Sequence, residues 1–187
     1  MAQSWRVKHQ SHKRPAPPLD EAALERLAIV YVGRYATTRA RLRSYLSRKL
    51  RERGWEGDGA PSIDPLVEKM ARLDYVNDEA YALARAASLR RRGLGERRAE
   101  QLFHAAGIAD EDSAEARREM REDALAGALR FAERKKIGPF ALEKANPRQR
   151  GKAFAAMIRA GHGLDITRRV LAMEQDDIPL CDSDQYS

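Results

Sequence analysis

Arginine and lysine side chains gather in groups along this chain of 187 residues, and their chemistry is the binding of negatively charged partners. Guanidinium and ammonium groups donate charge-assisted hydrogen bonds to phosphates and carboxylates. Together the groups favour a basic strip that matches a long acidic partner, although a single cation near a helix C-terminus can simply offset the helix dipole. The candidate contact residues are Arg39, Arg43, Arg48, Lys49, Arg51, Arg53, Arg90, Arg91, Arg92, Arg97, Arg98, Arg134, Lys135 and Lys136.

The residue types that usually carry catalysis do not converge in this sequence. The four histidines have no metal-ligand spacing with Cys, Asp or Glu, so no metal site is expected; they are His9, His12, His104 and His162. Gly93-Leu-Gly95 lacks the Gly-Lys-Ser/Thr of a phosphate loop and is better explained as the end of one helix and the start of the next. We therefore expect no enzyme activity and no cofactor.

Charge divides the chain into a basic body and an acidic end. The formal net charge is +7, and the last fourteen residues, 174–187, carry −5 with no Lys or Arg, which leaves +12 on residues 1–173. A body this basic favours nucleic acid, or a protein bound to nucleic acid, as the partner. Aromatic residues make up only 6% of the chain and do not alternate regularly with the cations, so no stacking platform for single strands is expected.

Two further features bear on the environment of the protein. The single cysteine, Cys181, can form no internal disulfide, which is typical of a reducing cytoplasm. No apolar run approaches the roughly 20 residues of a membrane span, and the basic start lacks the apolar core of a signal peptide. We expect a cytoplasmic protein without membrane contact, with a flexible basic arm at 1–19 and an acidic tail at 174–187.

The elements that must position these cations are helices. Ala, Leu, Arg and Glu dominate the sequence and are strong helix formers, whereas β-branched residues are sparse. Capping residues predict where helices begin, and these are Asp20, Thr37 or Thr38, Asp64 before Pro65, Asn77, Gly95, Asp112 with Glu115, Asn146 with Gln149, and Asp165. Glycines predict where helices end, namely Gly54, Gly93, Gly107, Gly138 and Gly161. The fold class is therefore predicted to be all-α.

An internal repeat organises these helices. Gly54, Gly107 and Gly161 are separated by 53 and 54 positions, and a large apolar residue lies four positions before each glycine. This period predicts three tandem three-helix repeats at 20–73, 74–121 and 122–173. Because each repeat contacts only its neighbours, we expect an elongated, curved array.

Three segments resemble the RecX family of bacterial regulatory proteins. They are LDYVNDEAYA at 73–82, RRRGLGERRAEQLFHAAGI at 90–108 and RARLRSYLSRKLRERG at 39–54. The likeness spans about residues 22–172, and the middle repeat is its most specific part. It implies three helix-turn-helix-like repeats in a bent monomer that catalyses nothing and uses no cofactor.

The resemblance also implies a partner and a role. Family members bind the RecA nucleoprotein filament in its helical groove and inhibit its ATPase, coprotease and strand-exchange activities, which modulates recombination and the SOS response. Many also bind single- or double-stranded DNA weakly. The alternative is a helix-turn-helix DNA-binding protein whose helix 96–106 enters the major groove. That helix offers Glu96, Glu100 and His104 where base-reading residues would be needed.

Overall fold

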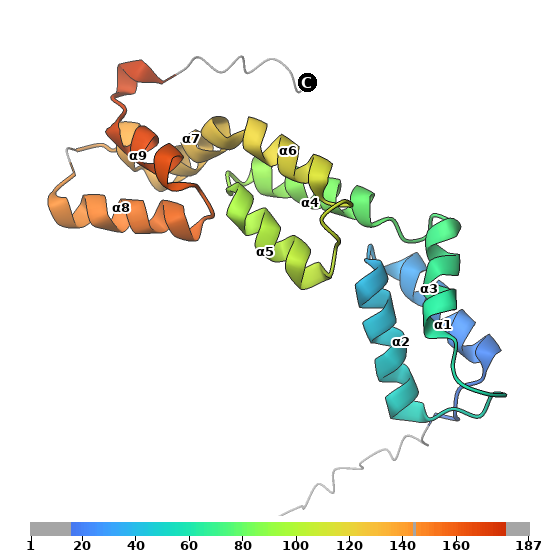
Figure 1. The fold of residues 1–187 in the computed structure, drawn as a ribbon. Coiled ribbons are helices and arrows are strands. Elements are labelled where there is room, and N and C mark those ends of the chain that lie inside the picture. Colours follow the sequence, from blue (N-terminus) through green and yellow to red (C-terminus); the bar gives the residue numbers. More distant parts are fainter. Residues whose placement is uncertain (1–15, 144, 179–187) are drawn as a thin grey trace, which may run out of the picture.

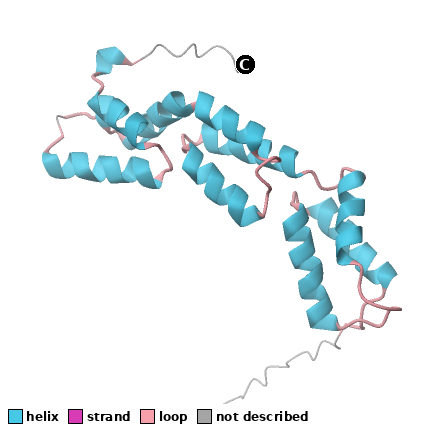
Figure 2. Ribbon diagram, in the orientation of Figure 1, coloured by secondary structure: helices cyan, strands magenta, loops and turns pink. Residues whose placement is uncertain are grey.

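A computed structural model describes residues 16–143 and 145–178, and this part of the chain is helical. The prediction of an all-α fold is confirmed, since the described residues form no strand beyond an isolated bridge between Leu19 and Trp55 (Figures 1 and 2). The α-helices are α1 (Glu21–Arg34), α2 (Arg39–Arg53), α3 (Ile63–Arg72), α4 (Asp78–Arg91), α5 (Glu96–Ala106), α6 (Ala114–Glu122), α7 (Ala124–Lys135), α8 (Pro147–Arg159) and α9 (Leu164–Ala172). Most of the predicted arm, most of the acidic tail, His9, His12 and Cys181 lie outside the described residues.

Three hydrophobic clusters follow one another along the chain. The first is built from α1, α2 and α3, the second from α4, α5 and α6, and the third from α7, α8 and α9. We call these groups of helices unit 1, unit 2 and unit 3. Leu94 packs against both the second and the third cluster. The division into equivalent repeats at residues 74 and 122 stays a prediction.

The units are arranged in a line rather than around one centre. Figure 1 shows them along an elongated, bent path, with α2, α5 and α8 on the inner edge of the bend. The central residues of each cluster are fully covered, for example Leu46, Ala99 and Met157. Each unit therefore has its own small core, and the orientation between units depends on the junctions.

Most of the predicted caps are present. The side chains of Asp20, Thr38, Asn77 and Asn146 accept hydrogen bonds from backbone N–H groups in the first turns of their helices, and Asn146 and Gln149 form a reciprocal capping box. Such a cap stabilises a helix by roughly 0.5–2 kcal/mol. These helix starts were predictable because every contact involved lies within three residues along the chain.

Two predicted caps at the starts of α3 and α6 are wrong. Ser62 precedes α3, and the Asp64 carboxylate instead accepts a hydrogen bond from Arg43 Nε at 2.5 Å. Ser113 precedes α6, and Asp112 forms an ion pair with Arg39 at 3.5 Å. In both cases a guanidinium group from α2 draws the carboxylate away from the helix that it was expected to cap.

Three further helix limits differ from the prediction. The helix predicted between its start at Asp112 and its end at Gly138 is divided at Asp123, whose φ and ψ of −87° and 7° separate α6 from α7. α7 ends at Lys135, and Lys136 follows it in the left-handed region with φ of +53°, before Gly138 is reached. α9 is preceded by Gly163 rather than capped by Asp165.

Candidate partner-binding surface

Four of the predicted contact residues on α2 are engaged by partners on the same helix or elsewhere in the N-terminal part of the chain. Arg43 is paired with Asp64 on α3, while Arg48 and Lys49 both bind Glu52 at 2.8 and 2.7 Å. The hydrogen bonds from Lys49 and then Arg48 lower the pKa of the Glu52 carboxyl. Arg53 Nε donates to the Pro17 carbonyl at 2.7 Å, which ties the end of α2 to the segment before α1. These cations contribute charge to the surface, but their geometry is fixed by internal partners.

Arg39 lies at the junction between units 1 and 2. Its backbone N–H donates to Asp78 Oδ1 at 2.9 Å, and its side chain pairs with Asp112. Beside it, Thr38 Oγ1 donates to the Ala106 carbonyl at 2.6 Å. Asp78 is only 4% exposed, and burial raises the pKa of its carboxyl. The start of α2 is therefore held by a carboxylate and a carbonyl from unit 2.

A second group of predicted contact residues lies at the junction between units 2 and 3. Arg90 reaches Glu119 at 2.7 Å and Asp123 at 3.5 Å, and Asp123 also binds Arg130. Arg130 Nε donates to the Arg90 carbonyl at 3.2 Å, and Arg134 donates to the Arg92 carbonyl. The guanidinium groups of α7 thus satisfy carbonyl groups at the end of α4, where a helix leaves them unpaired.

Backbone groups complete this second junction at the Gly-Leu-Gly turn. Gly95 N donates to the Ala160 carbonyl at 2.9 Å, and Arg97 N donates to the Gly161 carbonyl at 3.2 Å. A Cβ atom on residue 95 would overlap the Gly161 carbonyl oxygen and lie 2.6 Å from the His162 nitrogen. The turn does end α4 and start α5 as predicted, and its second glycine also allows two backbones to touch.

His162 is the buried titratable group of this junction. It is 2% exposed, packs against the Phe131 ring with centroids 5.5 Å apart, and follows Gly161. Burial lowers the pKa of its imidazole, opposed by a hydrogen bond with the Gly93 backbone. The sequence offered no indication of this role, because the partners of His162 are distant along the chain.

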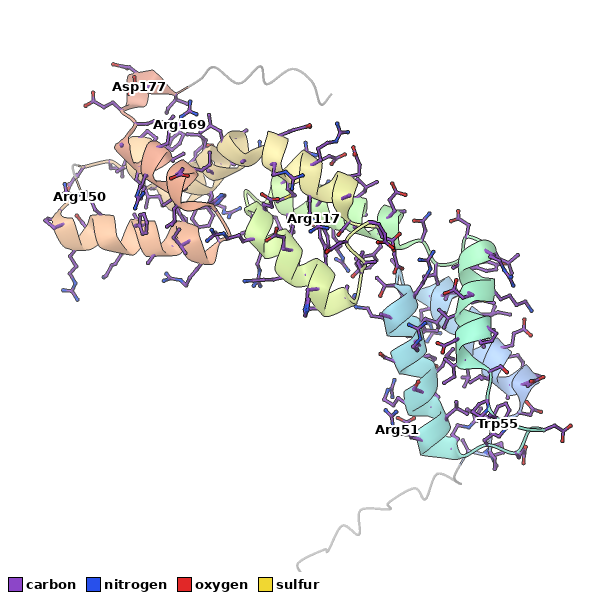
Figure 3. All side chains as sticks on the ribbon, viewed as in Figure 1. Arg51, Trp55, Arg117, Arg150, Arg169 and Asp177 are labelled. Atoms are coloured by element: carbon purple, nitrogen blue, oxygen red, sulfur yellow. The ribbon has the colours of Figure 1, made fainter. Side chains whose placement is uncertain are left out.

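Seven of the predicted contact residues remain as exposed cations. None of them forms an ion pair within residues 16–143 and 145–178, although Arg98 donates to Gln101 at 3.2 Å. Figure 3 shows Arg51 on α2 and, further along the bend, Arg150 on α8. The set, which we call the exposed cations, is Arg51, Arg91, Arg92, Arg97, Arg98, Lys135 and Lys136.

Two arginines that were not proposed as contact residues meet at the first junction. Arg41 of α2 and Arg85 of α4 both donate hydrogen bonds to the Tyr81 hydroxyl. A cation also lies beside an aromatic ring at Tyr45, whose ring centre is 5.5 Å from the Arg48 guanidinium, and the expectation that there is no stacking platform for single strands stays a prediction. Helical period alone places Tyr81 and Arg85 on one face, but Arg41 joins them only in the folded chain.

Other kinds of site find no support in the part of the chain that the structure describes. No three His, Cys, Asp or Glu side chains there gather as a metal-binding group. None of the described helices has both the length and the hydropathy needed to cross a membrane. At the start of α5, the backbone N–H groups of Gly95 and Arg97 are bound by the carbonyls of Ala160 and Gly161, while Glu100 and His104 on the same helix are exposed, and entry of this helix into a DNA groove stays a prediction.

Known proteins resemble this chain in both sequence and fold. No family model matches it. It is 31% identical to the regulatory protein RecX of Myxococcus xanthus over 174 residues, which are 88% of this chain and 91% of that protein, and 28% identical to the regulatory protein RecX of Agrobacterium fabrum over 75% of this chain and 77% of that protein.

Solved structures agree on the fold. The crystal structure of RecX from Lactobacillus salivarius superimposes with a TM-score of 0.58 at 18% identity, over 80% of this chain and 93% of that one. Another crystal structure of regulatory protein RecX gives a TM-score of 0.62 at 13% identity, over 80% of this chain and 70% of that one. From the extent of the likeness to the Myxococcus protein, this chain belongs to the RecX family of regulatory proteins.

Proposed function

We propose that this protein regulates the RecA recombinase by binding the RecA nucleoprotein filament and inhibiting its ATPase, coprotease and strand-exchange activities. In this way it would modulate recombination and the SOS response. The observation that carries the proposal is the close likeness, over most of the chain, to proteins named regulatory protein RecX. The protein is proposed to act in the cytoplasm as a monomer, without a cofactor, and to bind DNA weakly.

The shape of the molecule supports this proposal. Three units in a line can follow a helical groove and touch several filament subunits, whereas a compact domain of the same length could touch fewer. The inner edge of the bend carries α2, α5 and α8, and exposed cations such as Arg51 and Arg97 belong to these helices (Figure 1). Several weak contacts along such an edge raise the overall affinity for the filament, because after the first contact has formed each further contact forms at a high effective concentration.

A titration of RecA ATPase activity on single-stranded DNA tests the proposal. Substoichiometric amounts of this protein should depress ATP hydrolysis. The double variant R91Q/R92Q, which removes two exposed cations, should inhibit less than wild type. R117Q/R118Q is the matched control, because it also removes two adjacent arginines from unit 2, but both of these are paired on α6. Unchanged hydrolysis with fully formed filaments would contradict the proposal.

A further inference from the structure

Two guanidinium groups from different units converge on one phenol at the first junction. Arg41 comes from α2 in unit 1, and Arg85 lies one turn after Tyr81 in α4 of unit 2. Arg85 Nε donates to the Tyr81 hydroxyl at 3.2 Å, and Arg41 Nη1 donates to the same oxygen. Their guanidinium carbons lie 5.4 and 5.1 Å from the centre of the Tyr81 ring.

No carboxylate neutralises this pair within the part of the chain that the structure describes. Arg41 and Arg85 form no ion pair there, and two acids at this junction, Asp78 and Asp112, are engaged by Arg39. Two like charges held against one oxygen atom repel each other unless an anion lies between them. The site therefore has the charge of an anion-binding site that the chain itself does not fill.

The Tyr81 hydroxyl adds a third donor. Because its oxygen accepts hydrogen bonds from both arginines, its own proton is available to a ligand. Tyr81 is 9% exposed and packs in the core of unit 2, so the hydroxyl position is fixed, whereas Arg85 is exposed to solvent. The three donors come from two helices, not from the planar guanidinium group of one arginine. This arrangement suits the tetrahedrally placed oxygens of a phosphate better than the flat carboxylate group.

We propose that Arg41, Arg85 and Tyr81 form a binding site for a phosphodiester group of a nucleic acid backbone, placed where unit 1 meets unit 2. A phosphate bound there would bridge the two units, since it would contact α2 and α4 together. The formal net charge of +7 favours a polyanion over an isolated ion. This site extends the proposed function, but its test uses nucleic acid without RecA, so either idea can fail alone.

The experiment measures binding of the full chain to a labelled single-stranded oligothymidine by fluorescence anisotropy over a series of salt concentrations. Each phosphate contact contributes about 0.7 to the slope of log affinity against log salt for single strands. Because the proposed site holds one phosphate, the variant R41Q/R85Q should lower this slope by about 0.7. The control R117Q/R118Q removes the same charge from paired arginines of α6 and should leave the slope unchanged.

A second measurement distinguishes loss of the site from a folding defect of R41Q/R85Q, because it is made on wild-type protein. In wild-type protein, the Nε–H signals of Arg41 and Arg85 should shift together and saturate when inorganic phosphate is added, and Y81F should weaken that binding. Equal slopes for R41Q/R85Q and the control, or phosphate shifts shared by all arginines, would overturn the site. So would a variant that binds DNA normally but inhibits RecA less, because the site would then take an acidic protein surface.

Discussion

The contact between Gly95 and Gly161 allows a sharp test of how unit 3 is attached. The variant Gly95→Ala places a methyl group against the Gly161 carbonyl oxygen and 2.6 Å from the His162 nitrogen, both of which are backbone atoms that cannot rotate away. Separating the two segments breaks the hydrogen bonds from Gly95 N to Ala160 and from Arg97 N to Gly161. Two lost hydrogen bonds cost about 1–3 kcal/mol together, and overpacking adds about 1–3 kcal/mol.

The free energy of unfolding of this variant should therefore fall by about 2–6 kcal/mol, measured by urea denaturation with circular dichroism. Gly33→Ala is the matched control, because Gly33 lies in the last turn of α1 and no neighbouring atom lies within 4 Å of its added Cβ. It should leave the stability unchanged or raise it by less than about 1 kcal/mol, because the full benefit of replacing a glycine applies to the interior of a helix. If Gly95→Ala were as stable as wild type, the direct backbone contact between units 2 and 3 would be refuted.

Three further predictions use the same denaturation assay. N146A removes the capping box of α8 and should cost about 0.5–2 kcal/mol, whereas D165A, which removes no cap, should cost less than about 1 kcal/mol. Because the pKa of Asp78 is raised in the folded protein, wild type should gain stability relative to D78N as the pH falls from neutral towards 3.8; a constant difference would contradict this. Because the pKa of His162 is lowered, wild type should lose stability relative to H162Q as the pH falls below 6.5, and parallel pH curves would show that this histidine does not titrate differently on folding.

Helix starts could be predicted wherever the capping contacts are local. Asn146 and Gln149 satisfy each other within one turn, so their spacing alone was sufficient. Asp64 and Asp112 have equally good spacing, yet each is bound by an arginine of α2 that is distant along the chain. Helix propensity cannot show that an arginine competes with the helix start for the same carboxylate, because this competition depends on how the helices pack.

The glycines could be predicted as helix ends but not as contacts between units. Gly54, Gly107 and Gly161 were correctly predicted to follow helices, and all have positive φ. Gly54 combines its positive φ with an extended ψ of 174°, so it ends α2 outside the left-handed helical region. The closeness of Gly95 to Gly161 was not predictable, because glycine is an ordinary N-cap residue and this contact depends on how units 2 and 3 pack.

The candidate surface was the least predictable part. All fourteen proposed cations look alike in the sequence, but ion pairs and carbonyl contacts, within unit 1 and at the two junctions, engage half of them. Arg39, for example, links unit 1 to unit 2, and Arg90 pairs with Asp123 where unit 2 meets unit 3. The pair Arg41 and Arg85 was missed because only the packing of α2 on α4 brings them to Tyr81.

The stoichiometry of binding to RecA filaments on single-stranded DNA tests the central claim most directly. If the chain lies lengthwise along the filament, co-sedimentation should reach saturation at one chain for several RecA subunits, and ATP hydrolysis should reach its minimum at the same ratio. Saturation at one chain per RecA subunit would contradict an extended footprint, and absence from the filament pellet would contradict the proposed function itself.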